Sequence, residues 1–494
     1  MNLSSTITLP LWALILIGIL AAFSLLHHFL LPSVRWVFRR RANRVIDEVN
    51  QRLALTLPSF KLTKREVLID RLIYDARVMA AAEEISVQEQ VPRDAVMVRV
   101  RQYAREIVPA FNAFLYFKCG YWIARRLVHL LYRVRLGFAD DASLAKLGND
   151  SSVVFLMNHR SNMDYILATY LAAERTALSY AVGEWARVWP LQQLIRLMGG
   201  YFVRRNSGDP LYRRVLESYV QMAAEGGVPQ AIFLEGGLSR TGRLGSPKLG
   251  LLGYLTKDFT QQNERDIVFV PVGINYDRVL EDRTLIKPRK PGSSAAGAGT
   301  FFTAAKTVQY LFNNLWLALT GRWYRNGYAC VNFGSPVSLR AWNAQRVRTQ
   351  SDSPWEQDVE ALASDLMKRV GAVVPILPVA LVATVFQSSS QEAGGTQLSK
   401  LELKNHLFSL VDTLTAAGRH VYIPRGDMDY AVDVGIRMLT LRHILLDHDG
   451  VLSVNPREWT LLNFYAASIE HFLAPDNILT PQTASSTAES PFQP

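Results

Sequence analysis

The sequence predicts an α/β protein in which a mainly parallel sheet is flanked by helices, with an N-terminal transmembrane helix and helical N- and C-terminal regions. Between about 150 and 335, short apolar runs alternate with helical stretches, as in βαβ units. On both sides of that part, apolar residues recur at three- and four-residue spacing. The 494 residues, 49% hydrophobic and 20% charged, suffice for two or three domains with a large core.

The segment from Thr8 to Leu31 contains no charged residue and can cross roughly 30 Å of hydrocarbon as a helix. It lacks the basic start and cleavage site of a signal peptide, and so long an uncharged run is rare in soluble domains. Five arginines follow it closely: Arg35, Arg39, Arg40, Arg41 and Arg44. The positive-inside rule therefore predicts a single span in the inner membrane, residues 8–31, with the rest of the chain in the cytoplasm.

The net charge and the cysteine content indicate which kinds of partner and which cellular compartment to expect. A net charge of +11 favours an anionic partner, which could be nucleic acid, a membrane surface or a phosphorylated substrate. The basic residues behind an apolar segment favour anionic membrane lipid, and no nucleic-acid motif is present, so we expect no nucleic-acid partner. Cys119 and Cys330 offer neither a disulfide framework nor a CxxC pair, which predicts a reducing compartment and no structural zinc.

Residues 35–145 are predicted to be an N-terminal helical region. Its second stretch, "REIVPAFNAFLYFKCGYWIARRLVHLLYRVRLGF", combines apolar residues with five arginines and one lysine. Such a basic amphipathic helix can lie on an anionic bilayer or pack against another helix, and the sequence does not separate these two readings.

Residues 146–345 are predicted to form the α/β domain. Its expected strands are "SVVFLM", "GGYFVRR", "QAIFLE", "IVFVPVGINY" and "YACVNFG". After the second strand, a helix is marked by Asp209 as N-cap, Pro210 in the first turn, and Gly226 with Gly227 beyond its end. Residues 355–474 are expected to be helical with one apolar interruption, "AVVPILPVALVATVF", and residues 475–494 have the composition of a disordered tail.

Polar clusters follow four of the predicted strands. The carboxyl ends of parallel strands form the binding crevice of an open sheet, so these clusters are expected to share one edge. They comprise Asn158, His159, Arg160, Ser161 and Asp164; Arg204 and Arg205; Glu235, Gly236, Gly237, Ser239, Arg240, Thr241, Gly242 and Arg243; and the stretch "VPVGINYDR".

These residue types suit acyl transfer to a hydroxyl group. A histidine can take the proton of an alcohol at neutral pH, and a carboxylate can hold its tautomer. Arginines beside a glycine turn suit a phosphate group, although strand-end arginines are also often only solvated. No GxSxG elbow occurs, and Ser161 and Ser239 are better read as cap or turn hydroxyls than as nucleophiles. "LLDHDG" is read as local capping, so no metal site is assigned.

Taken in order, the four clusters resemble the four blocks of the glycerolipid acyltransferase superfamily. "NHRSNMD" is similar to the His-x4-Asp block, "GGYFVRR" to the second, "FLEGGLSRTGR" to the third and "VPVGINYDRV" to the fourth. "PKLG", "ILPVALVAT", "YAREIVPAF" and "NFYAASIEHFL" extend the resemblance over residues 95–474. The most similar branch is that of the membrane glycerol-3-phosphate 1-O-acyltransferases, with dihydroxyacetone-phosphate acyltransferases next.

The resemblance implies roles for particular residues. His159 would be the general base and Asp164 would orient it, while acyl-CoA or acyl-carrier protein would be the donor and glycerol 3-phosphate the acceptor. The acceptor side would be formed by Arg160, Ser161, Arg204, Arg205, Glu235, Gly236, Gly237, Ser239, Arg240 and Pro271. No metal or other cofactor is implied.

Two departures from the family pattern bear on the acceptor. Leu238 stands where the third block usually has arginine, and the loss of one charge-assisted hydrogen bond, about 1.5–3 kcal/mol, weakens binding by about one to two decades. Arg243 and Lys248 are near in sequence to that position. The chain also has "EDRTLIKPRKPGSS" where the family shows E-L-x-G-x-x-K. The alternatives are therefore acyl transfer to dihydroxyacetone phosphate or lysophosphatidate, or a catalytically silent lipid-binding or scaffold protein.

Overall fold

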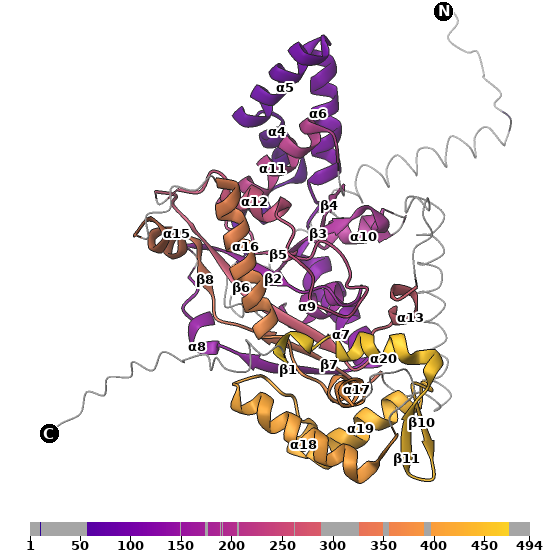
Figure 1. Ribbon diagram of the computed structural model, residues 1–494. Coiled ribbons are helices and arrows are strands. Elements are labelled where there is room, and N and C mark those ends of the chain that lie inside the picture. Colours follow the sequence, from indigo (N-terminus) through magenta and orange to yellow (C-terminus); the bar gives the residue numbers. More distant parts are fainter. Residues whose placement is uncertain are drawn as a thin grey trace, which may run out of the picture.

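The computed structural model describes residues 10, 57–148, 150–172, 176–187, 189, 191–204, 207–260, 262–287, 326–348, 355–389 and 397–473 (Figure 1). The predicted span at 8–31, apart from Pro10, and the predicted tail at 475–494 lie outside these residues. Within the described part of the chain, no helix combines the length and the hydropathy needed to cross a membrane.

An eight-stranded mixed sheet forms the centre of the molecule, in the order β1-β7-β6-β2-β5-β3-β4, with β8 paired to β6. The strands β2 to β6 run parallel, whereas β7 is antiparallel to β6 and parallel to β1. The predicted α/β class with a mainly parallel sheet is thus confirmed. The strands are β1 (Arg133–Ala139), β2 (Ser151–Met157), β3 (Ser179–Gly183), β4 (Tyr201–Val203), β5 (Gln230–Phe233), β6 (Asp266–Tyr276), β7 (Tyr328–Phe333) and β8 (Val337–Ser338).

All five predicted strands are present, as β2, β4, β5, β6 and β7, but β1, β3 and β8 of this sheet were not predicted. The strands β3 and β8 are short, and β1 lies in a stretch that we expected to be helical. The helix before β1 ends at Leu131, Tyr132 is extended, and Val134 is buried between the less buried Arg133 and Arg135, which is the two-residue period of a strand. Residue-by-residue pairing with β7 then outweighs helix propensity.

The side chains of β2 show how the sheet divides the core. Val154 and Leu156 pack in one hydrophobic cluster with helices of the N-terminal region, whereas Phe155 and Met157 pack in another with α9 and the C-terminal region. The first face is covered by α4 (Arg65–Ile73), α5 (Ala76–Glu89), α6 (Arg93–Ile107), α11 (Pro210–Glu225), α12 (Gly250–Thr256), α15 (Leu339–Arg348) and α16 (Trp355–Ala372). The second face is covered by α7 (Tyr121–Leu131), α9 (Asp164–Ala172), α17 (Pro378–Ser388) and α20 (Trp459–Ala466).

The capping signals read from the sequence are confirmed in α11. The Asp209 carboxylate accepts hydrogen bonds from the backbone N–H groups of Leu211 and Tyr212, at 2.9 and 3.2 Å. The helix ends at Glu225, and Gly227 has a φ of +71°, a left-handed conformation that glycine adopts without strain.

The basic stretch before the sheet does not form the single helix that we expected. It is divided after Ile107, where α6 ends, into a π-helical turn, η2 (Leu115–Gly120), and the separate helix α7. The two readings of this stretch, membrane surface or helix packing, apply to α7 alone. Its residues Ala124, Val128 and Leu131 are buried, so one side of α7 packs inside the protein.

The C-terminal region is not all helical. The second part of the apolar stretch that we read as an interruption lies in α17, which begins at Pro378, where proline needs no N–H donor. A small antiparallel sheet, β10-β11-β9, was not predicted; Figure 1 shows its hairpin beside α19 and α18. The elements are β9 (Gln397–Ser399), α18 (Lys400–Ala416), η4 (Pro424–Gly426), α19 (Met428–Thr440), β10 (Leu445–His448), β11 (Val451–Val454), η5 (Pro456–Glu458) and η6 (Glu470–Phe472).

The remaining short elements connect the larger ones. They are α3 (Ser59–Leu62), α8 (Asp141–Leu144), η3 (Glu184–Ala186), α10 (Leu191–Leu197) and α13 (Asp282–Leu285).

Candidate active site

His159 and Asp164 form a buried hydrogen-bonded pair directly after β2. His159 Nδ1 lies 2.9 Å from Asp164 Oδ2, and the two side chains are 3% and 0% exposed. The pair is close because β2 ends at Met157 and α9 begins at Asp164, so the connecting turn brings residue 164 back to the strand end. With Nδ1 directed to the carboxylate, Nε2 is the ring nitrogen left to exchange a proton with a substrate.

The Asp164 carboxylate is fixed by three further donors. Its Oδ2 accepts the backbone N–H groups of Arg160 and Ser161, at 2.7 and 3.0 Å, and its Oδ1 accepts the hydroxyl of Tyr276 at 2.7 Å. Tyr276 is the last residue of β6, within the fourth block, and the sequence alone did not suggest a role for it. The feature of the sequence that could have indicated a role for Tyr276 is its position at the end of a predicted strand, next to the polar clusters.

The imidazole ring of His159 is held by aromatic neighbours. It stacks on Phe233, the last residue of β5, with ring centroids 3.9 Å apart, and meets Tyr165 edge-on at 5.5 Å. Because the neighbours fix the ring plane and Asp164 fixes its rotation, the imidazole is held in one orientation. Phe233 is an apolar residue in a predicted strand, so its role had no signal in the sequence.

The third block supports the His159 backbone. The Glu235 carboxylate accepts the N–H of His159 at 2.9 Å and the N–H of Gly245 at 3.0 Å. Burial raises the pKa of Glu235. The Ser239 N–H donates to the His159 carbonyl at 2.9 Å, so both sides of the His159 backbone are bound to this block.

A glycine turn brings the third block back to the strand end. Gly236 has a φ of +67°, which glycine adopts without strain, and Gly237 follows it. The turn places Glu235 before it and Ser239 after it, and these two residues hold the loop that carries His159. The predicted meeting of the first and third blocks is thus observed.

Ser161 is not free to act as a nucleophile. Its hydroxyl donates to Glu281 Oε2 at 2.8 Å and accepts the N–H of Met163 at 3.1 Å. Glu281 Oε1 accepts the N–H of Asn162 at 3.0 Å, and burial raises the pKa of Glu281. Glu281 is therefore a supporting residue, and the sequence did not reveal it.

Ser239 is also used locally, because its hydroxyl donates to the Arg243 carbonyl at 2.7 Å. Both serines therefore have the cap and turn roles that we expected. The residues that meet around the base are called the His159 cluster, which comprises His159, Asp164, Glu235, Tyr276 and Glu281.

Arg160 is a buried cation beside this cluster. Its Nη1 donates to the Gly242 carbonyl, and its guanidinium lies 4.9 Å from the Phe464 ring centroid. Its Nε and Nη2 are buried and have no hydrogen-bond partner among the described residues. Burial lowers the pKa of this guanidinium. Arg160 therefore carries donors that an anionic substrate group can accept.

Arg204 belongs to a second polar centre. Its Nε and Nη2 donate to the two carboxylate oxygens of Glu106, at 2.8 and 2.6 Å, and Arg187 also pairs with this carboxylate. Arg196 Nη2 donates to the Glu106 backbone carbonyl at 3.2 Å. We call Glu106, Arg187, Arg196 and Arg204 the Glu106 cluster. Arg205 lies outside the described residues.

The structure does not join the Glu106 cluster to His159. The strand β4, which precedes Arg204, is three strand positions from β2, about 14 Å at the usual spacing. Arg204 lies against Tyr103 of α6 and Tyr212 of α11, whereas the His159 ring lies on Phe233 in the other core cluster. The two centres thus share the sheet edge but face different helical layers.

Two other predicted site residues also have structural partners. Arg240 donates to the carbonyls of Leu285 and Lys287, at 3.2 and 2.7 Å. Pro271 lies inside β6 and is paired with Leu156 of β2. On the side of β6 that faces away from β2, the neighbouring strand changes at this point from β8 to β7. Proline lacks an N–H group, and at this change of partner its absence removes no hydrogen bond of the sheet.

The two cations near Leu238 in sequence, Arg243 and Lys248, have different surroundings. Arg243 pairs with Glu470 at 2.6 Å, and the side chain of Lys248 is exposed. Arg160, which has buried N–H donors, directly follows His159 in the sequence, whereas Arg243 and Lys248 are far from His159 in the sequence.

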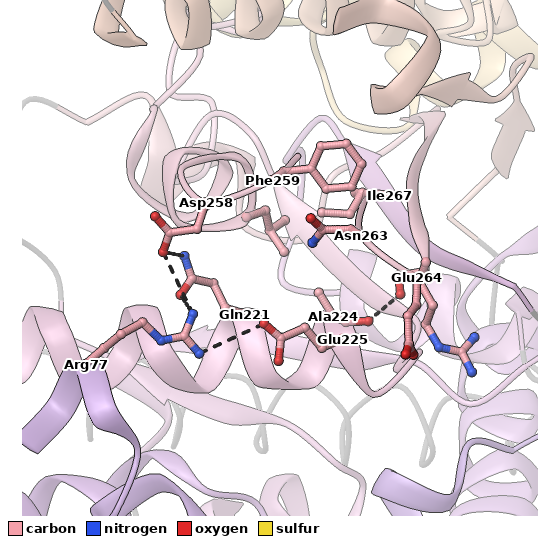
Figure 2. A pocket seen from close by; sticks show the side chains of 12 residues that line it. Arg77, Gln221, Ala224, Glu225, Asp258, Phe259, Asn263, Glu264 and Ile267 are labelled. Atoms are coloured by element: carbon pink, nitrogen blue, oxygen red, sulfur yellow. Dashed lines mark hydrogen bonds and ion pairs between the residues drawn. The ribbon is translucent and has the colours of Figure 1, made fainter. Parts of the chain in front are cut away.

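A cavity of about 300 Å³ opens at the other end of the sheet, away from His159. In Figure 2, Arg77 reaches Gln221, Asp258 and Glu225, so the charge of this arginine is compensated. Ser152, near the start of β2, places the cavity at the amino ends of the parallel strands. This position favours a packing role over a catalytic one.

No group of three or more His, Cys, Asp or Glu side chains that could hold a metal ion occurs in the part of the chain that the structure describes. The polar edge instead offers a histidine base, buried donors and a glycine turn.

Comparison with known proteins agrees with this arrangement. The sequence profile of the family described as "Acyltransferase" matches residues 141–275, and that of "Glycerol-3-phosphate acyltransferase C-terminal region" matches residues 313–480. The first match contains β2, β5 and the His159–Asp164 pair. The second contains the helices that pack against the third and fourth blocks.

Several curated proteins match most of the chain. The glycerol-3-phosphate acyltransferase of Ectopseudomonas mendocina (strain ymp) is 27% identical over 447 residues, covering 86% of this chain and 50% of that protein. The glycerol-3-phosphate acyltransferase of Aeromonas hydrophila subsp. hydrophila is 28% identical over 440 residues, covering 86% of this chain and 52% of that protein. The chain therefore spans about half the length of the curated relatives that it matches.

Among solved structures, the 1-acyl-sn-glycerophosphate (LPA) acyltransferase PlsC from Thermotoga maritima aligns with a TM-score of 0.30 and 15% identity, covering 62% of this chain and 94% of that chain. The two sequence profiles and the curated relatives carry the assignment. On these grounds, the chain is similar to glycerol-3-phosphate acyltransferases over most of its length.

Proposed function

We propose that this chain transfers a fatty acyl group from acyl-CoA or acyl-carrier protein to the sn-1 hydroxyl of glycerol 3-phosphate. The observation that carries the proposal is the buried His159–Asp164 pair, with Nδ1 bound to the carboxylate and Nε2 left for the substrate, in a chain similar to glycerol-3-phosphate acyltransferases. The product is 1-acyl-glycerol-3-phosphate, a precursor of phospholipids.

The pair suits a direct transfer without an acyl-enzyme. His159 Nε2 takes the proton of the acceptor hydroxyl while its oxygen attacks the thioester carbonyl carbon. Asp164 stabilises the imidazolium that forms, because its carboxylate already accepts the Nδ1 proton. The tetrahedral intermediate then collapses, the C–S bond breaks, and the leaving thiolate takes the proton from the imidazolium. No residue changes its covalent state over the whole reaction.

Arg160 is the residue that best supplies an anion contact near the base. It follows His159 directly, and two of its guanidinium nitrogens are buried without a hydrogen-bond partner among the described residues. A phosphate or a developing oxyanion can accept both donors. We assign Arg160 this role in place of the cation lost at Leu238, since Arg243 is already paired with Glu470.

Because of Leu238, we also propose other acceptor molecules as alternatives to glycerol 3-phosphate. Dihydroxyacetone phosphate and lysophosphatidate each carry a phosphate and a hydroxyl, and the replacement of the usual arginine removes one contact to that phosphate. The polar contacts of Glu235, Ser239 and Arg240 are made within the protein, so these residues shape the loop rather than define one acceptor.

An anionic membrane surface is the second partner that we propose. The uncharged segment 8–31, followed by arginines, favours an anchor in the inner membrane with the α/β domain in the cytoplasm. In α7, Ala124 and Val128 are buried while Trp122 and Ile123 are 56% and 50% exposed. A tryptophan on the exposed side of a basic helix suits the lipid headgroup region.

The proposed function is tested by an acceptor panel. Membranes containing the protein are given labelled acyl-CoA or acyl-carrier protein with glycerol 3-phosphate, dihydroxyacetone phosphate or lysophosphatidate in turn. We expect acylation of glycerol 3-phosphate with at least one donor. Transfer to another acceptor alone would move the substrate assignment, and no transfer to any acceptor by folded protein would contradict the proposal.

A further inference from the structure

A second basic pocket lies at the boundary between the sheet and the C-terminal region. It is an open pocket of about 450 Å³, lined by three arginines and three tyrosines: Arg133, Arg135, Tyr328, Tyr422, Arg425 and Tyr430. We call it the Arg133 pocket. None of its residues belongs to the four sequence blocks or to the His159 cluster, and the proposed acyl transfer does not use them.

The arginines of this pocket are oriented by tyrosines. Arg133 Nη1 donates to the Tyr430 hydroxyl at 2.9 Å, and Arg135 Nε donates to the Tyr422 hydroxyl at 2.9 Å. The Arg425 guanidinium lies 4.2 Å from the Tyr430 ring centroid. Phenol groups thus hold the guanidinium groups in place without the full negative charge of a carboxylate.

No carboxylate pairs with these three arginines in the part of the chain that the structure describes. The buried Asp277 feels the charge of Arg133, but its carboxylate accepts the N–H groups of Tyr328 and Val379, at 2.8 and 3.2 Å, rather than a guanidinium. Elsewhere Arg204 and Arg442, by contrast, each meet a carboxylate, at 2.6 and 2.5 Å. The Arg133 pocket therefore concentrates positive charge that a bound anion can offset.

The backbone at Arg425 is itself unusual. Its φ is +62°, in the left-handed region that residues other than glycine seldom adopt, and it lies in the short turn η4 before α19. In this conformation the guanidinium lies over the Tyr430 ring. Such a conformation is kept only when surrounding contacts require it, and it often marks a ligand site.

The floor of the pocket is firmly held. Arg133 and Tyr328 are paired as the first residues of β1 and β7, and Tyr328 packs with Cys330 and Leu377 in a small buried cluster. One part of the pocket comes from the sheet and the other from η4, α19 and the chain before them. A ligand there contacts both the α/β domain and the C-terminal region.

We propose that the Arg133 pocket binds a phosphate-monoester anion, at a site separate from the acyl-transfer site. Guanidinium groups bind a phosphate through paired N–H donors, and three of them converge here from two distant parts of the chain. The phosphate has two sources, a lipid headgroup such as that of phosphatidate or a soluble phosphate. Both present the same anionic group.

The test is isothermal titration calorimetry on the full chain purified in detergent. The probes are inorganic phosphate, dihexanoyl phosphatidate and, as a lipid without a phosphate monoester, dihexanoyl phosphatidylcholine. The variant is Arg133→Gln with Arg425→Gln, and the control is Arg101→Gln, an exposed arginine on α6. Since the His159 cluster is intact in all three proteins, the difference between variant and control reports the pocket alone.

We expect phosphatidate or phosphate to bind the wild type and the control, with a Kd about tenfold or more higher in the double variant. Tighter binding of phosphatidate than of phosphate identifies the lipid source, and the reverse order identifies a soluble one. Equal binding by variant and control, or no binding of either phosphate to the wild type, overturns the proposal. If the double variant fails to fold, Arg425→Gln alone serves, because this exposed side chain makes no hydrogen bond within the described residues.

Discussion

The His159 cluster and the Glu106 cluster lie at the same edge of the sheet but are built in opposite ways. In the first, buried acids accept backbone N–H groups, and burial raises the pKa of Glu235 and Glu281. In the second, burial alone would raise the pKa of Glu106, but the hydrogen bonds and charges of Arg204 and Arg187 outweigh it and lower the pKa. The first centre holds the His159 imidazole in one orientation, whereas in the second two arginine side chains share one carboxylate and the cluster of three arginines keeps a net positive charge.

This difference shows that sequence blocks which end at the same edge of a sheet need not form a single site. All four blocks end near one sheet edge, yet among the residues that the structure describes, contacts at His159 and Asp164 come from the first, third and fourth blocks. The second block contains Arg204, whose carboxylate partner Glu106 comes from α6, before the α/β domain. Changes that affect one centre and leave the other intact can separate their roles.

The largest expected effect is that of Asp164→Asn. Without the carboxylate, the imidazole loses its tautomer control and the stabilisation of the imidazolium, so the transfer rate should fall by about 10²–10⁴-fold. Arg204→Gln, in the other cluster, should change the rate far less. Initial rates at saturating donor and acceptor, with thermal unfolding as the check of folding, measure both; equal losses in the two variants would argue against separate roles.

The next effect concerns the loop that supports His159. A Cβ at Gly242 would overlap the Phe464 backbone carbonyl, and this glycine has a φ of +86°. Gly242→Ala should therefore lower the free energy of unfolding by more than the about 1–2 kcal/mol that a left-handed backbone alone costs.

Gly418→Ala is the matched control for that change. Gly418 has a similar φ of +70°, but nothing lies within 4 Å of the place that a Cβ would take. Denaturant unfolding of both variants separates the two costs: a similar loss in each would mean that the contact between the third block and α20 contributes little.

Glu106→Gln should act on stability more than on the rate. Its removal leaves Arg187 and Arg204 without their carboxylate, which should cost about 1–3 kcal/mol at pH 7. Because the folded-state pKa of Glu106 is lowered, its contribution is present above the unfolded pKa and is lost as the pH falls through the folded pKa. Thermal unfolding of wild type and variant should converge in acid; a difference that persists there would rule out the ion pairs as its cause.

Glu281→Gln should show the smallest effect and the opposite pH trend. The folded-state pKa of Glu281 is raised, so the folded protein holds this proton more tightly than the unfolded chain, and stability falls as the pH rises from the unfolded to the folded pKa. The stability of the variant should not decrease over this pH range, because glutamine does not titrate. Its unfolding midpoint should therefore vary less with pH than that of the wild type. Parallel pH profiles for the two proteins would contradict this assignment.

Much of the α/β core could be predicted because burial imposes periodicity. The continuous apolar runs of β2, β5 and β6 and the capping of α11 by Asp209 are local signals, and the structure contains each of them. The strand β1 was missed because Arg133 and Arg135 follow a helical pattern directly, and only pairing with β7, almost two hundred positions away in sequence, makes this segment a strand.

The candidate site divides in the same way. His159, Asp164 and Glu235 follow strands, so the polar-edge rule finds them. Phe233 and Glu106 have roles that depend on contacts between separate elements, with an imidazole ring in one case and with arginines in the other, and no local pattern encodes such contacts. Tyr276 was within reach of the rule, but a tyrosine at a strand end is also an ordinary core residue.

One measurement tests most directly whether His159 is the base for acyl transfer. Transfer of labelled acyl groups to glycerol 3-phosphate is compared for wild type, His159→Ala and His406→Ala, the last being an exposed histidine on α18. We predict that His159→Ala loses about 10²–10⁴-fold in rate while it still folds cooperatively, with a lower unfolding midpoint, and that His406→Ala keeps an activity close to wild type. A folded His159→Ala protein that retains wild-type transfer would contradict the assignment of the base.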